Sequence, residues 1–350
     1  MNLSGKRIFV GLSGGVDSAV TAALLQKAGA SVVGVFIKGW YPPGMPCTWA
    51  EDRRDAMRVA AALGIPFVTL DAEKEYKQGV IDYLLREYAA GRTPNPDVMC
   101  NREVKFGAFY RYAMEKGADG IATGHYARVE DGRLYRGADA TKDQSYFLWA
   151  VPKEVLQKTL FPLGVLLKTD TRQLAKKFKL PNAAKRDSQG ICFLGSISVE
   201  DFLAQEFSTE SGDAFDTHGQ YVGVHDGAVL HTLGSRVALT DAAPGPWYVV
   251  RKDVRANTLT VSRVRNESVH TGRILLTETN MLREVSSNFE ISMQYRYHGP
   301  RSAGRYDLLH HAFEPSEALP EPLAPGQSLV LYDGDEVIGG GIIAEDAIMS

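Results

Sequence analysis

Two cysteines in polar surroundings are the residues of this sequence best suited to covalent chemistry. Cys100 lies within GRTPNPDVMCNREVKFG and Cys192 within LPNAAKRDSQGICFLG. We expect a helix to begin close to Cys100, and a helix N-terminus together with Arg102 and Lys105 would favour the nucleophilic thiolate. A small buried hydrophobic residue is the alternative role for either cysteine. The third cysteine, Cys47, makes no Cys-x-x-Cys spacing with them, which argues against a zinc site.

A glycine-rich turn near the N-terminus could bind an anion. The stretch GLSGGVDSAV (11–20) follows a short apolar run of strand type and precedes an alanine- and leucine-rich helical pattern. Backbone N–H groups of such a turn can surround phosphate oxygens. Ser18 can add its hydroxyl group, and Asp17 could hold Mg²⁺ against the phosphate. The stretch has neither the Gly-Lys-Ser/Thr ending of a Walker A loop nor the glycine spacing of a dinucleotide site. A simple tight connection between strand and helix is the alternative.

The elements that must position this turn alternate between strands and helices as far as residue 125. Such alternation is typical of a parallel sheet with helices on both faces. Ligands of these sheets lie at the carboxyl ends of the strands, which is where the glycine-rich turn falls. We expect strands at 7–12, 31–38, 66–71 and 120–123, and helices at 19–28, 51–63, 76–88 and 103–116.

The second half of the chain has a different pattern of predicted secondary structure. A hairpin with its turn at Asp131-Gly132 is expected over 126–137, and 152–206 reads as mostly helical. From residue 207 onward, short β-type runs are separated by Gly, Asp and His turns, which favours small β-barrels or sandwiches. We therefore predict a catalytic α/β domain with a helical basic segment at 1–205, a central β-rich module at 206–269 and a barrel-like module at 270–350.

Composition indicates a cytoplasmic enzyme of several domains. A chain of 350 residues is too long for one typical core. No apolar run reaches the roughly 18 to 20 residues needed to span a bilayer, and three cysteines do not suggest a disulfide framework. The net charge is −3, yet 151–200 carries nine Lys and Arg against four Asp and Glu. This basic block could attract a polyanion, or it could be a solvated face of an amphipathic helix.

Together these stretches resemble the tRNA-specific 2-thiouridylases, the MnmA family. The likeness covers nearly the whole chain, through the Ser-Gly-Gly-Val-Asp-Ser turn of the PP-loop ATP pyrophosphatases, both cysteine motifs, IATGHYAR, KDQSYFL, PWYVVRKD and LYDGDEVIGGGII. It implies a PP-loop domain followed by two β-rich modules, and ATP-dependent 2-thiolation of the wobble uridine in tRNAs for Lys, Glu and Gln. Two stretches depart from the family's pattern. Ser235 replaces a glutamine in HTLGSRVALTDAAPG, and an Arg-Tyr pair expected near Gln294-Tyr295 is not intact, although Arg296 follows.

The resemblance also implies roles for single residues and for partners. ATP would adenylate the uridine carbonyl oxygen, with Mg²⁺ on Asp17. Cys192 would carry a persulfide received from a sulfur-carrier protein, and Cys100 would form a transient disulfide with it. Asp97 would be placed for proton transfer, while His125 could equally be structural. The implied ATP contacts are Gly11, Leu12, Ser13, Gly14, Gly15, Val16, Asp17, Ser18, Ile37 and Gly124, and the implied tRNA contacts are Asn95, Pro96, Asp97, His125, Lys142, Asp143, Gln144 and Gln327.

Two other functions compete with thiolation. A PP-loop ligase or amidotransferase that acts on a small molecule would need neither the cysteine pair nor a β-rich half. A non-catalytic RNA-binding adaptor on a decayed PP-loop scaffold would need neither the intact turn nor the cysteines. The presence of all these features in one chain favours the thiolating enzyme.

Overall fold

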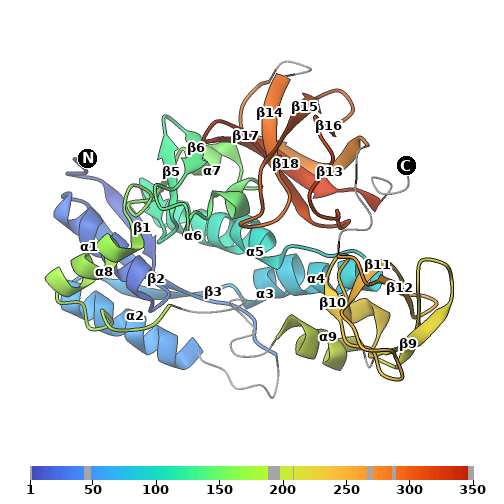
Figure 1. Ribbon diagram of the computed structural model, residues 1–350. Helices are drawn as coiled ribbons and strands as arrows, with labels where there is room; N and C mark the ends of the chain where they lie inside the picture. Colours follow the sequence, from blue (N-terminus) through green and yellow to red (C-terminus); the bar gives the residue numbers. More distant parts are fainter. Residues whose placement is uncertain are drawn as a thin grey trace.

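A five-stranded sheet forms the centre of the N-terminal part of the protein (Figure 1). The computed structural model describes residues 2–42, 49–187, 198–207, 209–265, 270, 272–285 and 289–345. The strands are β1 (Arg7–Gly11), β2 (Ser31–Lys38), β3 (Phe67–Asp71), β4 (Gly120–Ala122) and β7 (Thr159–Leu160). Their order is β3-β2-β1-β4-β7 and all neighbours pair in parallel, which confirms the predicted α/β class. The short β7 lies in a stretch that was expected to be mostly helical.

Helices cover both faces of this sheet, because alternate residues of each strand point to opposite sides. The helical elements are α1 (Val16–Lys27), α2 (Trp49–Leu63), α3 (Glu73–Tyr76), η1 (Lys77–Ile81), α4 (Asp82–Ala89), α5 (Pro96–Met99), η2 (Cys100–Ala108), α6 (Phe109–Glu115), η3 (Ser145–Leu148), α7 (Lys153–Leu156) and α8 (Lys168–Lys177). On β1, Ile8 and Val10 pack in one apolar cluster with α1, α2 and α8. Phe9, between them, packs in a second cluster with α4, η2 and α6.

The C-terminal module is a closed antiparallel barrel of six strands. They are β13 (Ile274–Met281), β14 (Phe289–Gln294), β15 (Ser302–Asp307), β16 (Ala312–Pro315), β17 (Ser328–Asp333) and β18 (Glu336–Ile343). The ring closes where β13 pairs with β18. The predicted hairpin is confirmed as β5 (Ala127–Glu130) and β6 (Arg133–Arg136), and β6 pairs with β18. The barrel sheet therefore includes two strands from the N-terminal half of the chain.

A smaller sheet lies between these two parts in the sequence. Its strands are β8 (Gly212–Phe215), β9 (Tyr221–His225), β10 (Arg236–Val237), β11 (Trp247–Asp253) and β12 (Thr258–Ser262), with the one-turn helix η4 (Ala228–Leu230) among them and α9 (Val199–Phe207) before them. The domain boundaries at 205/206 and 269/270 stay predictions, and α9 crosses the first of them. No helix in the described ranges is long and apolar enough to cross a membrane.

The three parts share one apolar core. The cluster that holds Phe9 also contains Leu230 of the small sheet and Val330 of the barrel, all of them buried. Figure 1 shows the barrel above the parallel sheet and the small sheet beside α4 and α9. Burial of apolar surface between the modules fixes their relative positions.

Candidate active site

The glycine-rich turn joins β1 to the N-terminus of α1 at the carboxyl edge of the parallel sheet, as predicted. The hydroxyl group of Ser18 accepts from the Ser13 N–H at 3.2 Å and donates to the Gly15 carbonyl at 3.1 Å. The Asn182 side chain donates to the Gly14 carbonyl at 2.9 Å. These bonds hold the loop in shape, so that its N–H groups at the helix N-terminus are set for an anion.

A lysine that the sequence analysis did not single out lies beside this turn. Lys168, the first residue of α8, places its Nζ atom 2.7 Å from both carboxylate oxygens of Asp17. The hydroxyl group of Tyr126 donates to the same carboxylate at 3.1 Å. Lys168 and Asp17 are 151 positions apart, and no spacing or motif links them. Only the packing of α8 against α1 brings the two charges together.

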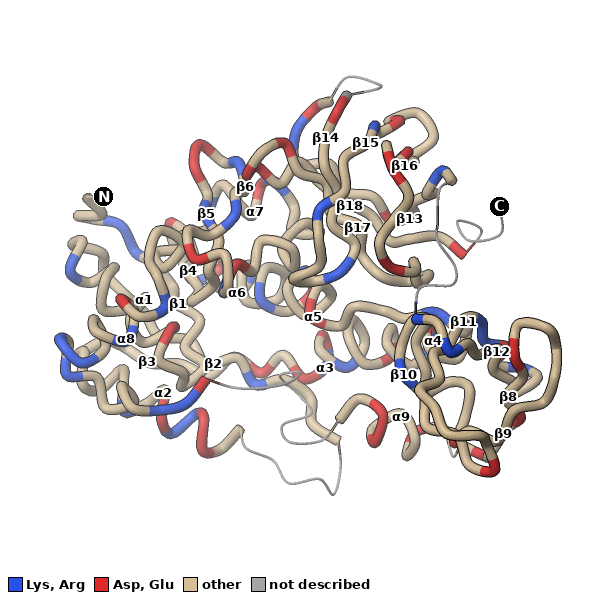
Figure 2. Tube along the Cα trace, in the orientation of Figure 1, with Lys and Arg blue, Asp and Glu red and all other residues tan. Residues whose placement is uncertain are grey.

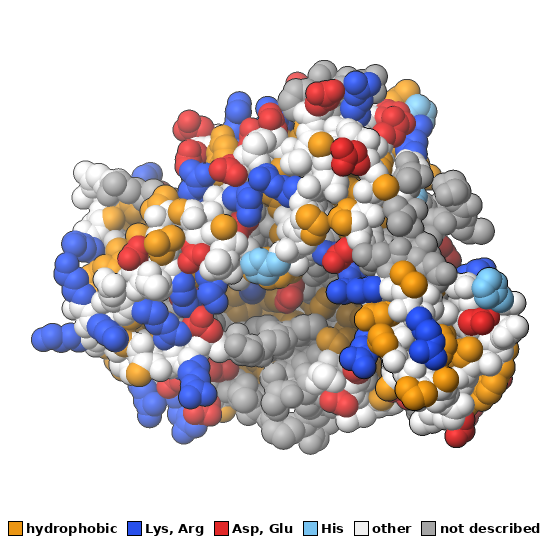
Figure 3. Space-filling view, viewed as in Figure 1, with side chains coloured by type: hydrophobic (Ala, Val, Ile, Leu, Met, Phe, Trp, Pro, Cys, Tyr) orange, Lys and Arg blue, Asp and Glu red, His pale blue; other side chains and the backbone are white. Residues whose placement is uncertain are grey.

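One cavity of about 290 Å³ contains both the glycine-rich turn and Cys100. Ile37 and Gly124 also line it, and their contact with ATP stays a prediction. Figure 3 shows a hollow in this face of the molecule, with basic side chains at its rim. The described residues that line the cavity include Gly11, Leu12, Ser13, Asp17, Ser18, Ile37, Cys100, Lys105, Gly124, His125 and Gln144.

Cys100 lies on a helix that begins earlier than the sequence predicted. The sequence predicted a helix over 103–116, but helical structure starts at Pro96 and runs without a break through α5, η2 and α6. The Asn95 side chain accepts from the Val98 N–H at 3.3 Å, and Pro96 occupies the first helical position. Both features stabilise a helix start. Cys100 is therefore held in the second turn, buried with 5% exposure, at the wall of the cavity.

The carboxyl group of Asp97, one helical turn before Cys100, has a shifted pKa. Burial raises the pKa of Asp97 above its usual range, and the nearby Lys105 opposes this shift. A raised pKa suits a carboxyl group that exchanges a proton during catalysis. Lys105 lines the same cavity as Cys100, and its expected effect on the thiolate stays a prediction.

His125 has the environment of a neutral, well-packed side chain. It is 7% exposed and its Nδ1 atom lies 2.6 Å from the hydroxyl oxygen of Thr123. The rings of Phe106 and Phe161 pack against it with centroids 5.7 and 5.9 Å away. Burial, with Lys105 as a smaller cause, holds the pKa of His125 well below its ordinary value. Its ring still lines the cavity, so an uncharged contact with RNA stays a prediction.

The other residues implied to contact tRNA lie in different surroundings. Lys142 is 3.6 Å from Asp187, and Gln144 accepts from the Tyr126 N–H and lines the cavity. Asp143 is buried and engaged within the protein, and Gln327 has a buried amide oxygen for which the described residues provide no hydrogen-bond partner. Cys192 lies outside the described residues, so its pairing with Cys100 stays a prediction.

The basic block of the sequence is partly neutralised in the fold. Lys185 lies 2.8 Å from both Asp52 and Asp55, and Arg172 pairs with Asp187. Figure 2 shows Lys and Arg along α8 and α2 with Asp and Glu among them. The exposed lysines at the end of α8 are the part of the block that is left to attract a polyanion.

The residues around the turn are compatible with a magnesium ion that is held mostly by phosphate. The described residues contain no cluster of three or more His, Cys, Asp or Glu that could form a metal site by themselves. Mg²⁺ commonly binds through one or two carboxylates together with substrate phosphates. Asp17 lines the cavity beside the hydroxyl group of Ser18, so it offers one such carboxylate.

Comparisons with known proteins agree along the whole chain. Family models match 6–196 (tRNA methyl transferase HUP domain), 200–263 (tRNA methyl transferase PRC-barrel domain) and 271–343 (Aminomethyltransferase beta-barrel domain). The chain is 42% identical to the tRNA-specific 2-thiouridylase MnmA of Geobacillus thermodenitrificans, over 97% of this chain and 95% of the relative. It is 43% identical to the protein of that name from Streptococcus pyogenes, over 96% and 95%. Among solved structures, the U34-tRNA thiolase NcsA from Methanococcus maripaludis matches 58% of this chain and 67% of its own, at 17% identity and a TM-score of 0.36.

Proposed function

The chain belongs to the tRNA-specific 2-thiouridylase family, and from this premise we propose that its cavity thiolates the 2-position of a wobble uridine in tRNA. The protein is an ATP-using enzyme that transfers sulfur to tRNA. We also propose that its substrates are the tRNAs for Lys, Glu and Gln. A sulfur-carrier protein is proposed to supply the sulfur to the enzyme. Its cytoplasmic location and the division into functional domains at 205/206 and 269/270 are part of the proposal.

The single observation that carries the proposal is that the anion-binding turn and Cys100 open into the same cavity. A carbonyl oxygen that is activated at the turn would lie in the same cavity as the Cys100 thiol, which assists sulfur delivery. A small-molecule ligase that uses ammonia has no need of Cys100 there, and an adaptor has no need of either group.

The activation step uses the groups around the turn. The uridine carbonyl oxygen attacks the α-phosphorus of ATP, pyrophosphate leaves, and the base becomes an adenylate. The backbone of 11–15 and the hydroxyl group of Ser18 bind phosphate oxygens, and Lys168 offsets their negative charge from beside Asp17. Mg²⁺ held by Asp17 would supply further charge neutralisation. Asp97, whose pKa burial raises, takes the proton that the base gives up.

The sulfur step uses the two cysteines. Cys192 carries a persulfide, and the Cys100 thiolate attacks the inner sulfur of that persulfide. A Cys100–Cys192 disulfide forms and hydrosulfide leaves. The hydrosulfide adds to C2 of the adenylated base, and AMP leaves with the oxygen. A reductant then returns both cysteines to thiols.

The decisive experiment compares Cys100→Ser with the wild-type protein in one turnover. The variant is expected to release pyrophosphate when tRNA is added, because Cys100 takes no part in activation, but to form no thiouridine unless hydrosulfide is supplied. Pyrophosphate release and nucleoside mass analysis are the measurements. Normal thiolation by Cys100→Ser without added reductant would contradict the two-cysteine step. Pyrophosphate release that depends on a small metabolite instead of tRNA would contradict the proposed function itself.

A further inference from the structure

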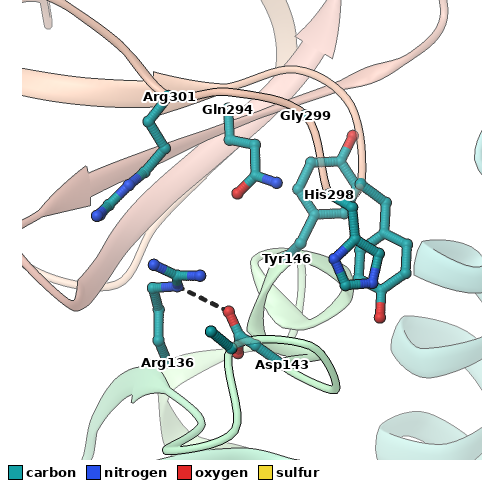
Figure 4. Close-up of a pocket in the computed structure, with 9 residues that line it drawn as sticks. Arg136, Asp143, Tyr146, Gln294, His298, Gly299 and Arg301 are labelled. Carbon is teal, nitrogen blue, oxygen red and sulfur yellow. Dashed lines mark hydrogen bonds and ion pairs between the residues drawn. The ribbon is translucent and has the colours of Figure 1, made fainter.

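A second cavity lies between the N-terminal domain and the barrel, and no role is assigned to it above. Its volume is about 240 Å³. The N-terminal domain supplies Arg136 at the end of β6, Ala140 and Asp143 from the connection that follows, and Tyr146 in η3. The barrel supplies Gln294, Tyr297, His298, Gly299 and Arg301 (Figure 4). We propose that this cavity, called the junction cavity below, binds a phosphate group, namely a backbone phosphate of tRNA next to the target uridine. The tRNA source rests on the proposed function.

Two guanidinium groups approach the junction cavity from opposite walls. Arg136 uses its Nε atom to donate to Asp143 at 2.8 Å, and its terminal nitrogens point toward Gln294 and Arg301 (Figure 4). Arg301 donates to the Gly334 carbonyl at 2.6 Å and stacks over the Tyr332 ring at 5.6 Å. The planar forks of two arginines match the oxygens of a phosphate group. Gln294, which is buried, donates its amide N–H group to the Arg296 carbonyl at 2.9 Å, so the contacts to a phosphate would come from the two arginines.

The carboxylate of Asp143 does not prevent anion binding, because its oxygens are already engaged. They accept from Arg136, from the Gly137 N–H at 2.9 Å, and from the N–H and hydroxyl groups of Ser145 at 3.1 Å each. Arg136 and Arg301 together outweigh its single charge. Asp143 is thus a positioning residue that orients Arg136, which differs from the direct tRNA contact that the resemblance implied for it.

The position of the junction cavity relates it to the active site. Asp143 lines the junction cavity, whereas the next residue, Gln144, lines the cavity of Cys100. Tyr297 is near enough to Asp143 and Asp97 that both raise the pKa of its hydroxyl group, after burial as the main cause. A strand of RNA with its target base in the Cys100 cavity therefore has its adjacent backbone at the junction cavity. The exposed rim, with Tyr297 and His298, leaves the phosphate site open to a large substrate.

The test replaces Arg301 by Gln and uses Arg305→Gln as a matched control. Arg305 lies on β15, the strand that begins directly after Arg301; it is exposed and pairs with Glu290 at 3.4 Å, but it does not line the junction cavity. Arg301→Gln is expected to weaken tRNA binding roughly tenfold. The slope of log affinity against log salt should fall in magnitude by about one for the lost phosphate contact. Arg305→Gln should change neither quantity, and Arg301→Lys should restore the slope but only part of the affinity.

A second arm distinguishes the source of the phosphate. Inorganic phosphate is titrated into wild-type protein and Arg301→Gln, with ³¹P line broadening as the readout. Binding of free phosphate that Arg301→Gln abolishes, with unchanged tRNA binding, would show a phosphate site filled from solution. If Arg301→Gln changes neither tRNA binding nor phosphate binding, the phosphate site is overturned. If the wild-type protein neither binds nor thiolates tRNA, the proposed function is overturned instead. The phosphate titration then decides whether the site exists.

Discussion

Lys168 links the glycine-rich turn to α8 through Asp17, and its removal gives a direct prediction. Lys168→Met leaves the Asp17 carboxylate without the cation that lies 2.7 Å from both of its oxygens. Charge-assisted hydrogen bonds of this kind contribute about 1.5–3 kcal/mol. We expect tRNA-dependent pyrophosphate release to fall roughly 10- to 100-fold while tRNA affinity stays the same. Lys27→Met, at the exposed end of α1 and outside the basic block, is the control, and equal rates in both variants would exclude this role of Lys168.

The Asp97 carboxyl group gives a prediction that depends on pH. Because burial raises its pKa, Asp97 takes up a proton at a higher pH than an ordinary aspartate. If its carboxylate accepts the proton of the base, thiolation should decline as pH falls through this raised pKa. Asp97→Asn should be slower at every pH and should lack that decline. An unaltered acid limb in the variant would assign the proton transfer to another group.

The same pKa shift has a consequence for stability. The folded protein binds the Asp97 proton more tightly than the unfolded chain does, so ionised Asp97 costs stability above the folded pKa and this cost disappears as pH falls. Asp97→Asn should therefore raise the thermal midpoint at pH 7 relative to wild type. The difference should vanish near pH 3, where both states of the wild-type protein are protonated.

At the scale of the elements, the turn between β1 and α1 depends on a glycine in close contact with α2. Gly14 has φ +81°, and a Cβ atom there would lie 2.4 Å from the Asp52 carbonyl oxygen. Gly64 has φ +64° but open space around it. Both Gly→Ala variants incur backbone strain of about 1–2 kcal/mol, but only Gly14→Ala must also displace α2. We expect Gly14→Ala to lose ATP binding and Gly64→Ala to retain it, as measured by nucleotide titration. Equal ATP affinity in both would show that the loop tolerates the shift.

Local patterns in the sequence predicted much of this architecture, and the differences have identifiable causes. The parallel sheet and the β5–β6 hairpin were predictable because the alternation of strand and helix patterns and the Asp131-Gly132 turn are local signals. The helix was predicted to start at residue 103, so its start at Pro96 was missed, although Asn95 followed by proline is a capping pattern. Lys168 could not be found from spacing, since only tertiary packing places it beside Asp17. The closure of the barrel likewise depends on a distant pairing between β13 and β18.

At the scale of the whole molecule, the three modules meet at the segment that leads into the Cys100 helix. The Thr93 N–H donates to the Pro325 carbonyl of the barrel at 2.7 Å. The Thr93 hydroxyl group lies 3.3 Å from that of Thr232 in the central module. Both β-rich modules therefore contact the chain two residues before the helix cap Asn95. This arrangement lets an RNA that binds the barrel influence the position of Cys100.

Gly326 of the barrel allows this contact to be tested. It has φ +89°, and a Cβ atom there would lie 3.0 Å from both the Arg92 Cβ and the Thr93 backbone nitrogen. Gly334, in the same barrel, has φ +57° and open space around it. Both Gly→Ala variants strain the barrel backbone, but only Gly326→Ala pushes on the 92–95 segment and shifts the start of the Cys100 helix. Gly326→Ala should therefore thiolate tRNA several-fold more slowly than Gly334→Ala. It should also change the alkylation rate of Cys100 in the free protein. ATP binding without tRNA should be equal in the two variants. Matching thiolation and alkylation rates would mean that the barrel binds its part of the substrate without setting the position of the cysteine.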